Sequence, residues 1–353
     1  MSGIRIHPFQ LQFKRPAKTS RNTLLEKQCY LLIYGTPLRA IGECNFFLGL
    51  SADDPSNYDS VLKGACKRLE VLFGLEAPLE DERFDALVCE LAHYPSIQFG
   101  IEQLWYSYHA KTPFHLYDSA FSNHEEGIAI NGLVWMGDIP FMRQQVDNLI
   151  SDGFRCIKLK IGAENFEHEQ RLLQDLRGKY GADELEIRVD ANGSFSPETA
   201  PKILDQLAQL EIHSIEQPIA AGQWDQMAEL CQFSPIPIAL DEELIGLFSS
   251  DDKKRCLDHI RPHYLILKPA LIGGFKACNE FIESDFGWWI TSALESNIGL
   301  NAIAQFTSTK KLHRPQGLGT GGLFVNNFES PLEVCNAQLF YRNHLTWNLN
   351  SIA

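Results

Sequence analysis

Five successive apolar segments between residues 156 and 269 each end in charged residues that could bind a metal ion and move a proton. These endings are Lys158-Leu159-Lys160, Asp190-Ala191-Asn192, Glu216-Gln217-Pro218, Asp241-Glu242-Glu243 and Lys268-Pro269. Three carboxylates held close together repel one another and retain protons, whereas coordination of a hard cation such as Mg²⁺ removes the repulsion. The sequence therefore predicts a divalent metal site with lysines beside it.

The spacing of the carboxylates indicates that they lie on neighbouring strands. Asp190, Glu216 and Asp241 are 26 and 25 positions apart, close to the length of one strand-helix unit. Lys158 and Lys160 are two positions apart, so both side chains point to the same face of a strand. A single aspartate after a strand is usually a helix cap, and a single lysine is usually a solvated charge. Their recurrence at five consecutive strands favours the functional interpretation.

The elements that must position these residues follow an alternating pattern after about residue 128. Short apolar segments alternate there with amphipathic helical segments, which is typical of a parallel sheet with crossover helices. Strands are expected at residues 130–135, 156–159, 186–189, 214–216, 236–240, 264–267 and 288–292, with a weaker eighth at 317–320. Eight such units predict the α/β fold class, as a (β/α)8-type barrel over residues 126–325. The reacting groups of such barrels lie at the C-terminal ends of the strands.

A barrel of this kind takes about 250 residues, so the chain of 353 residues must carry a second unit. Strand-like stretches at 4–14, 29–34 and 38–44 precede helical periodicity at 58–73, 81–93 and 96–109. This order predicts an α+β N-terminal capping domain over residues 1–125. The tail, residues 326–353, is expected to return to the capping domain and complete it.

Composition limits the partners and the compartment. The formal net charge is −14, with no basic tract, so nucleic acid is not an expected partner. A small anionic carboxylate substrate could still bind where a cation and lysines reverse the local field. Nine scattered cysteines without a C-x-x-C pair, no signal-peptide core and no membrane-length apolar run predict a cytoplasmic protein without membrane association. The oligomeric state is not predicted.

The motifs at the strand ends resemble those of the muconate-lactonising branch of the enolase superfamily, over essentially the whole chain. They are K-x-K at 158–160, V-D-A-N at 189–192, I-E-Q-P at 215–218, L-D-E at 240–242 and L-K-P at 267–269. The resemblance implies that Lys160 is the base and that Lys268 lies on the opposite face. It also implies that the three carboxylates bind Mg²⁺, with Mn²⁺ as a substitute.

This implied chemistry is physically consistent. Removal of a proton next to a carboxylate creates an enediolate, whose developing charge needs a cation held in place. Lys160 can act as a base only if its pKa falls, and burial with a neighbouring charge such as Lys158 would lower it. Asn192 and Glu242 are expected to support the metal site from behind its ligands.

Further markers resemble the o-succinylbenzoate synthases of menaquinone biosynthesis. They are Gly273-Gly274 after L-K-P, the segment from Ser292 to Ser296, and the Gly-Leu-Gly-Thr-Gly-Gly loop at 317–322. The resemblance implies syn-dehydration of 2-succinyl-6-hydroxy-2,4-cyclohexadiene-1-carboxylate to 2-succinylbenzoate, with Lys160 returning its proton to the departing hydroxyl and Lys268 stabilising the enediolate. The residues expected to contact or support the substrate are Ser292, Glu295, Gly319, Thr320 and Gly321. Backbone N–H groups at 319–321 could bind a substrate carboxylate.

The sequence leaves other functions open. The same branch contains racemases of N-succinylamino acids and dipeptide epimerases, which use both lysines as bases. Dipeptide epimerases usually carry D-x-D after the last strand, where this chain has Gly-Thr-Gly-Gly. A catalytically silent barrel would not need the intact lysines and carboxylates. Residues 42–50 lie where the family has a specificity loop over the barrel, although an ordinary turn explains them equally well.

Overall fold

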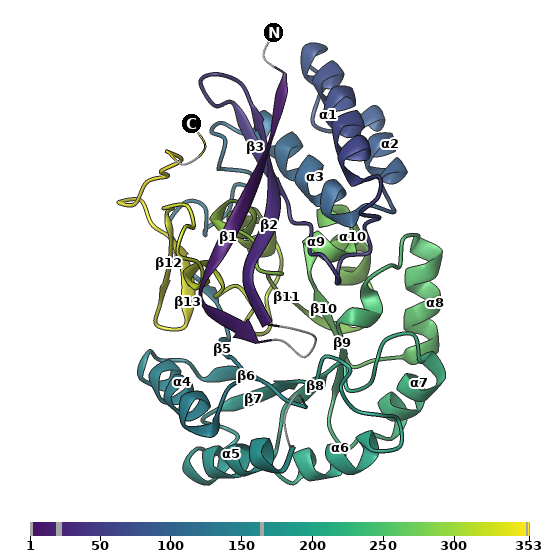
Figure 1. Ribbon diagram of the computed structural model, residues 1–353, viewed down its shortest axis with the longest axis vertical. Coiled ribbons are helices and arrows are strands. Elements are labelled where there is room, and N and C mark those ends of the chain that lie inside the picture. The colour runs from purple at the N-terminus through teal and green to yellow at the C-terminus, as the bar shows by residue number, and fades with distance from the viewer. Residues whose placement is uncertain (1–2, 19–22, 163–165, 351, 353) are drawn as a thin grey trace.

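The computed structural model describes residues 3–18, 23–162, 166–350 and 352. An antiparallel sheet of β1 (Ile4–Lys18), β2 (Thr23–Tyr34) and β3 (Ala40–Cys44) begins the chain. Helices α1 (Tyr58–Gly74), α2 (Glu82–Glu90) and α3 (Pro95–His109) follow and gather beside this sheet (Figure 1). This order of strands and then helices matches the predicted α+β unit.

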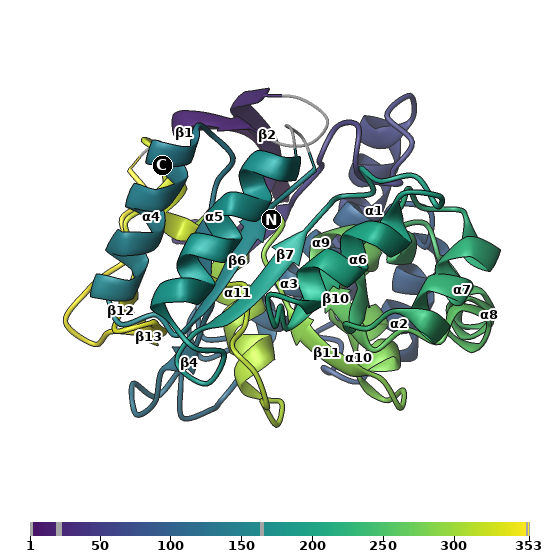
Figure 2. The same cartoon turned by 90° about the horizontal axis from the view of Figure 1, so that it is seen from below.

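The second unit is a curled parallel sheet of seven strands in sequential order. Its strands are β5 (Gly132–Val134), β6 (Cys156–Lys160), β7 (Glu186–Asp190), β8 (Ser214–Glu216), β9 (Ile238–Leu240), β10 (Tyr264–Leu267) and β11 (Gly287–Ile290). The helices are α4 (Ile139–Ser151), α5 (Phe166–Lys179), α6 (Ala200–Ala208), α7 (Trp224–Phe233), α8 (Ser250–Ile260), α9 (Pro269–Ile272), α10 (Gly274–Ile282) and α11 (Asn297–Ser308). Helices α4 to α8 form an arc outside the strands (Figures 1 and 2). The strands are therefore buried on both faces, which explains their apolar runs.

The predicted eighth strand is reduced to two isolated bridges. Residues 317–320 do not form a strand, and parallel bridges Ile130↔Gln316 and Thr291↔Gly317 take its place. Gln316 donates its N–H to Ala129 O at 2.9 Å, and Gly317 donates to Ile290 O at 2.8 Å. Gln316 and Gly317 thus join the two edges of the sheet. The glycine-rich chain after them forms a loop and the short helix η2 (Gly321–Leu323).

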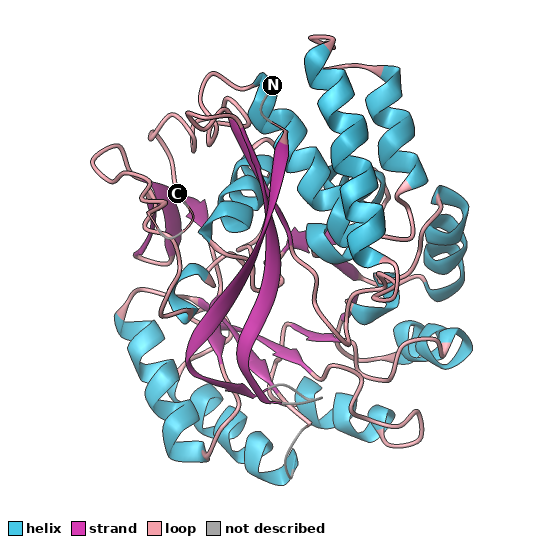
Figure 3. Ribbon diagram, turned by 45° about the horizontal axis from the view of Figure 1, so that its top comes forward, coloured by secondary structure: helices cyan, strands magenta, loops and turns pink. Residues whose placement is uncertain are grey.

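The C-terminal tail contacts both units. Strands β12 (Leu332–Cys335) and β13 (Gln338–Tyr341) form a hairpin that pairs with β4 (Ile128–Ala129), just before the barrel. Phe328 stacks on Phe9 of β1 with ring centroids 4.7 Å apart. In Figure 3 the long β1-β2 ribbon runs in front of the strands of the barrel. The division into residues 1–125, 126–325 and 326–353 stays a prediction.

The described helices include none that is long and apolar enough to cross a membrane. All nine cysteines are free thiols.

Strand β3 and helix α3 approach each other closely at two glycines, Gly42 on β3 and Gly100 on α3. A side chain at either position would clash with the other element. A Cβ on Gly42 would lie 2.4 Å from the carbonyl oxygen of Gly100, and one on Gly100 would lie 2.3 Å from Cys44 Sγ. We expect Gly42→Ala to destabilise the protein by about 1–3 kcal/mol through overpacking, measured as a lower midpoint of urea denaturation.

The matched control is Gly64→Ala in α1, where an added Cβ meets nothing within 4 Å. This change should stabilise the helix by about 0.5–1 kcal/mol because alanine restricts the unfolded chain. Equal midpoints for the two variants would show that the close approach of β3 and α3 does not constrain the fold.

Candidate active site

Strand register brings the predicted charged residues together at one end of the barrel. Lys160 on β6 lies opposite Asp190 on β7, and Asp190 lies opposite Glu216 on β8. Asp241 directly follows β9, and Lys268 directly follows β10. The five strand endings therefore form one continuous polar surface at the C-terminal edge of the sheet.

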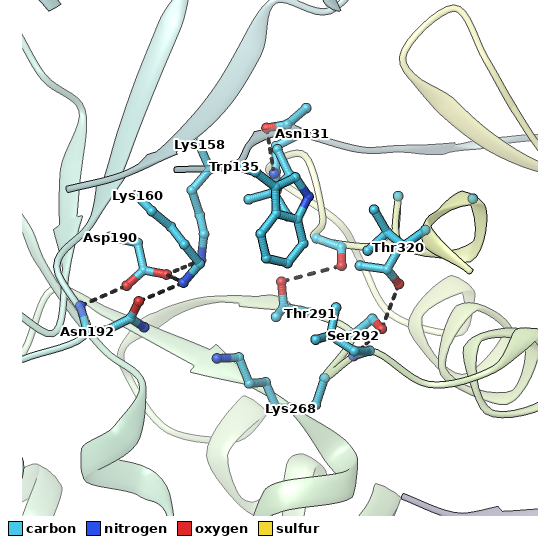
Figure 4. Close-up of a pocket in the computed structure, with 18 of the residues that line it drawn as sticks. Asn131, Trp135, Lys158, Lys160, Asp190, Asn192, Lys268, Thr291, Ser292 and Thr320 are labelled. Atoms are coloured by element: carbon cyan, nitrogen blue, oxygen red, sulfur yellow. Dashed lines mark hydrogen bonds and ion pairs between the residues drawn. The ribbon is translucent and has the colours of Figure 1, made fainter. Parts of the chain in front are cut away.

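The lysines and carboxylates form a buried network of ion pairs. Lys158 Nζ lies 2.9 Å from Asp190 Oδ2 and also pairs with Glu216 Oε2. Lys160 Nζ lies 3.0 Å from Asp190 Oδ2, and Lys268 Nζ pairs with Asp241 Oδ2. Figure 4 shows Lys158 and Lys160 on one side of a cavity and Lys268 approaching from another. Each carboxylate thus faces at least one ammonium group.

The three carboxylates fit a divalent metal ion. Asp190, Glu216 and Asp241 are each at most 1% exposed, and one oxygen from each lies within 4.8 Å of the others. Glu216 Oε1 is buried and has no hydrogen-bond partner among the described residues, so it is available as a ligand. An all-oxygen set of three anionic side chains is the kind that hard cations such as Mg²⁺ prefer. The site could therefore hold a metal ion.

The network shifts the pKa of several of its members. Burial alone lowers the pKa of Lys158, but Asp190, Glu216 and Asp241 outweigh burial, and the net pKa is raised. Burial lowers the pKa of Lys268 as well, and Asp241 raises it above its ordinary value. For Asp190, burial favours protonation, but the nearby lysines hold its pKa below the usual range.

Glu216 differs from its neighbour. Burial raises its pKa, Lys158 opposes the rise, and Asp190 and Asp241 add to it, so its pKa is raised overall. The surroundings of this cluster therefore lower the pKa of one carboxylate, Asp190, and raise the pKa of another, Glu216. Such divergence is common where a protein concentrates charge for a functional purpose.

Asn192 and Glu242 line the cavity beside the carboxylates, and their role as supporting residues stays a prediction. Asn192 Oδ1 accepts from Lys160 Nζ at 2.6 Å, and Asn192 Nδ2 donates to Glu242 Oε1 at 3.1 Å. The Asn192 backbone N–H donates to Asp190 Oδ1 at 3.0 Å, with its own φ in the left-handed region at 45°. The asparagine therefore orients both Lys160 and Asp190.

A cavity of about 490 Å³ opens in front of this network. Its charged lining combines Lys158, Lys160 and Lys268 with Asp152, Asp190 and Glu242. Ser292 and Thr320 line it across from Lys158 and Lys160 (Figure 4). The cavity is large enough for a small organic ligand. Lysine amines at one end and hydroxyl groups at the other offer hydrogen-bond donors to a molecule that carries polar groups at both ends.

The other predicted substrate residues are placed unevenly. Gly319 lines the cavity with Thr320, whereas Gly321 and Glu295 do not. Glu295 is fully buried behind Ser292, and its Oε2 is hydrogen-bonded to the Ser292 hydroxyl. The backbone of Gly321 begins η2, and its carbonyl accepts from Asn327 Nδ2 at 2.8 Å.

Much of the apolar lining was not predicted. Phe47, Leu48 and Leu50 reach the cavity from the turn after β3, and Trp135 reaches it from the end of β5. Residues 42–50 therefore include a loop that contributes to the site. The sequence position of this loop, which matches that of a specificity loop in the family, was the signal that could have predicted its place at the cavity. The sequence around Trp135 gives no such signal, because it looks the same as that around a core residue.

Comparison with known proteins agrees with this geometry. Residues 141–318 match the family model of the enolase C-terminal domain-like proteins. An o-succinylbenzoate synthase of Desulfotalea psychrophila is 40% identical over 365 residues, which cover 95% of this chain and 98% of that protein.

Solved structures extend the comparison. MenC from Desulfotalea psychrophila matches with a TM-score of 0.82 and 36% identity, covering 96% of this chain and 99% of MenC. The L-Ala-D/L-Glu epimerase from Bacillus subtilis shares the fold, with a TM-score of 0.78 at 19% identity over 99% of this chain and 98% of the epimerase. The chain therefore belongs to the enolase superfamily, in the family of the o-succinylbenzoate synthases.

Proposed function

We propose that this protein is an o-succinylbenzoate synthase, which dehydrates 2-succinyl-6-hydroxy-2,4-cyclohexadiene-1-carboxylate to 2-succinylbenzoate with Mg²⁺ as cofactor. The observation that carries the proposal is that Lys160, Lys268 and Asp190 line one cavity, and that Asp190 belongs to a close triad with Glu216 and Asp241. Near-full-length similarity to a synthase of that name supports the choice of reaction.

Asp190, Glu216 and Asp241 would hold the metal ion. Bound Mg²⁺ supplies positive charge that favours the build-up of negative charge on a substrate carboxylate. Mn²⁺ has similar ligand preferences and would serve in its place. Lys158 pairs with Asp190 and Glu216 and would hold the ligand carboxylates in position.

Lys160 carries both proton transfers in the proposed reaction. Its neutral amine takes the proton from the ring carbon that bears the carboxylate, and the electrons pass into that carboxylate as an enediolate. The resulting ammonium then gives this proton to the hydroxyl on the adjacent ring carbon. The C–O bond breaks, water leaves, and the ring becomes aromatic. One lysine can perform both steps because the proton and the hydroxyl leave from the same face.

Lys268 and Asn192 assist without exchanging protons with the substrate. Lys268 reaches the cavity from β10 and provides a fixed positive charge beside the enediolate. Asn192 holds the Lys160 amine by a hydrogen bond of 2.6 Å, which keeps it oriented between the two transfers.

Loss of the diene absorbance of the substrate tests the proposal. Purified protein with Mg²⁺ should remove the ultraviolet signal of the cyclohexadiene rapidly, and product should appear in equal amount. The Lys160→Ala variant should leave the signal unchanged over the same period. A wild-type protein that leaves the diene intact would contradict the assigned reaction while leaving the metal site untouched.

Racemisation of N-succinylamino acids is the second candidate. Lys160 and Lys268 both line the cavity, and a racemase needs a base on each face of its substrate. Polarimetry of an N-succinylamino acid in the presence of Mg²⁺ tests this activity directly. In a racemase, Lys268→Ala would abolish exchange of one enantiomer's α-proton with solvent and spare the other's.

A further inference from the structure

The turn that follows strand β10 carries Lys268 and is held at both of its ends. At its start, Lys268 Nζ pairs with Asp241 Oδ2, and the Lys268 carbonyl accepts the N–H of Leu271 at 2.8 Å. This backbone bond begins α9, a single helical turn of four buried residues. Lys268 and Leu271 both line the cavity. The path of α9 therefore decides where the Lys268 amine lies.

The far end of α9 consists of Gly273 and Gly274, with φ of 103° and 84°. Such values lie in the left-handed region that favours glycine. Space excludes a larger residue as well. A Cβ on Gly274 would lie 2.1 Å from Glu102 Oε2, and one on Gly273 would lie 2.7 Å from Gln98 Oε1. Both side chains come from α3. The two glycines after L-K-P are therefore a point of close approach between the N-terminal α+β unit and the barrel.

Glu102 binds the start of α10 with both of its carboxylate oxygens. Oε2 accepts the N–H of Phe275, and Oε1 accepts the N–H of Lys276 at 3.2 Å. The side chain is buried, and a carboxylate is stabilised by the free N–H groups at the N-terminus of a helix. The ring of Phe275 also packs on Phe99 of α3, with centroids 5.5 Å apart. These contacts attach α10, and with it the end of α9, to the N-terminal unit.

The charge state of Glu102 sets the pH at which these bonds are complete. Burial raises the pKa of Glu102 to about 7, while the N–H groups of Phe275 and Lys276 and the Lys276 ammonium oppose the rise and Asp85 adds to it. A protonated carboxyl would offer one carbonyl oxygen and one hydroxyl to two N–H donors. At pH 8 the carboxylate is the main form, so both N–H groups have an acceptor.

We propose that Glu102 is a positioning residue, which holds the α9 turn from the N-terminal unit so that the Lys268 amine stays at the cavity wall. Glu102 itself does not line the cavity and acts through the turn. This inference rests on the proposed function, in which Lys268 provides a fixed positive charge beside the enediolate. Such stabilisation depends on a charge that is in place before the reaction begins. A looser turn would therefore slow the reaction.

Amide hydrogen exchange at pH 8 tests the position of the turn without any reaction. Glu102→Gln offers one oxygen to the two N–H groups and turns an N–H donor towards the other. We expect residues 269–276 to exchange at least about tenfold faster in this variant, as for the loss of one hydrogen bond to a charged group. Unchanged exchange of this segment would overturn the proposal.

Ser107→Ala is the matched control on the same helix. Ser107 is buried, and its hydroxyl accepts from Ile41 N at 2.9 Å and donates to Pro113 O at 2.6 Å, both within the N-terminal unit. The variant loses buried hydrogen bonds of α3 without touching α9, so exchange of residues 269–276 should stay within about twofold of the wild type. Equally fast exchange in Ser107→Ala and Glu102→Gln would show a general loosening of α3 and would overturn the proposal.

A double-mutant cycle tests whether the effect on dehydration passes through Lys268. We expect Glu102→Gln to lower kcat about tenfold at pH 8, with the affinity for Mg²⁺ changed less than about threefold. In a Lys268→Ala background the same change should alter kcat less than about twofold, because no amine is left to displace. An unaltered kcat in the first case, or a tenfold loss in both backgrounds, would overturn the proposal.

Gly274→Ala disturbs the same contact from the side of the barrel. Its Cβ would meet Glu102 Oε2, so the carboxylate must move away from α10, and kcat should fall about tenfold as in Glu102→Gln. Gly222→Ala controls for backbone strain, because Gly222 has a φ of 89° and its added Cβ would meet nothing within 4 Å. Thermal melting checks that each variant folds. A folded Gly274→Ala protein with the kcat of Gly222→Ala would contradict the role of Glu102.

These outcomes are separable from failure of the proposed function. A wild-type protein that leaves the diene intact would contradict the dehydration, whereas faster exchange of residues 269–276 in Glu102→Gln would still support the positioning of α9. Wild-type dehydration together with an unaltered kcat in Glu102→Gln would contradict the positioning role alone.

Discussion

Replacement of Lys160 by alanine is expected to lower kcat for dehydration by about 10³-fold to 10⁴-fold, at the upper end of what one general acid-base group contributes. The amine lies at the cavity wall, 2.6 Å from Asn192 Oδ1 and 3.0 Å from Asp190 Oδ2. Lys158 also lines the cavity, but its amine pairs with both Asp190 and Glu216, whereas the Lys160 amine pairs with Asp190. The measurement is the rate of loss of the diene absorbance at saturating substrate.

Lys160→Arg separates the charge of this residue from its ability to lose a proton. Arginine can keep an ion pair with Asp190, but it is not deprotonated in proteins and cannot act as the base. We therefore expect an equally inactive enzyme whose affinity for Mg²⁺ stays close to that of the wild type. Lys202→Ala, at an exposed lysine of α6, is the control for loss of a positive charge. A Lys160→Arg enzyme with wild-type turnover would remove Lys160 from the role of base.

The barrel and its charged site were predictable because the strands carry local signals. Each strand is a short apolar run, and the residue that follows it must lie at the C-terminal edge of a parallel sheet. Asp190, Glu216 and Asp241 could thus be placed together from their spacing alone. The family resemblance added the distinction between base and ligand, and those roles stay predictions.

Elements that depend on long-range contacts were harder to predict. The pairing of β4 with β13 joins residues about 210 positions apart, for example Ala129 with Gln338, and no local pattern encodes it. Residues 317–320 were predicted to form the eighth strand because they follow a helix, as a barrel strand should. Only the first of them, Gly317, forms a bridge. Trp135 and Phe47 were missed because an aromatic side chain at a cavity wall has the same sequence pattern as one in a core.

Replacement of Glu216 by glutamine is expected to weaken Mg²⁺ binding at least about a hundredfold, because even changes behind a metal ligand cost about tenfold to a hundredfold. Glutamine keeps the size of the side chain and one carbonyl oxygen, but it removes the negative charge of a residue that is 0% exposed. Isothermal calorimetry with Mg²⁺ measures the loss, and dehydration should fall in parallel at a fixed metal concentration. Glu229→Gln, on the exposed face of α7, should bind Mg²⁺ as the wild type does.

The metal-free protein distinguishes a ligand from a simple structural ion pair. Glu216 pairs with Lys158, and its pKa is raised because burial and the neighbouring carboxylates oppose its charge. Removing the charge of Glu216 relieves its repulsion from Asp190 and Asp241, and Lys158 keeps Asp190 as a partner. The metal-free variant should therefore have a melting temperature close to that of the metal-free wild type. Added Mg²⁺ should raise the melting temperature of the wild type and not of Glu216→Gln, because only an ion that binds the folded state stabilises it. Equal stabilisation of both proteins by Mg²⁺ would place the ion elsewhere and leave Glu216 as the partner of Lys158.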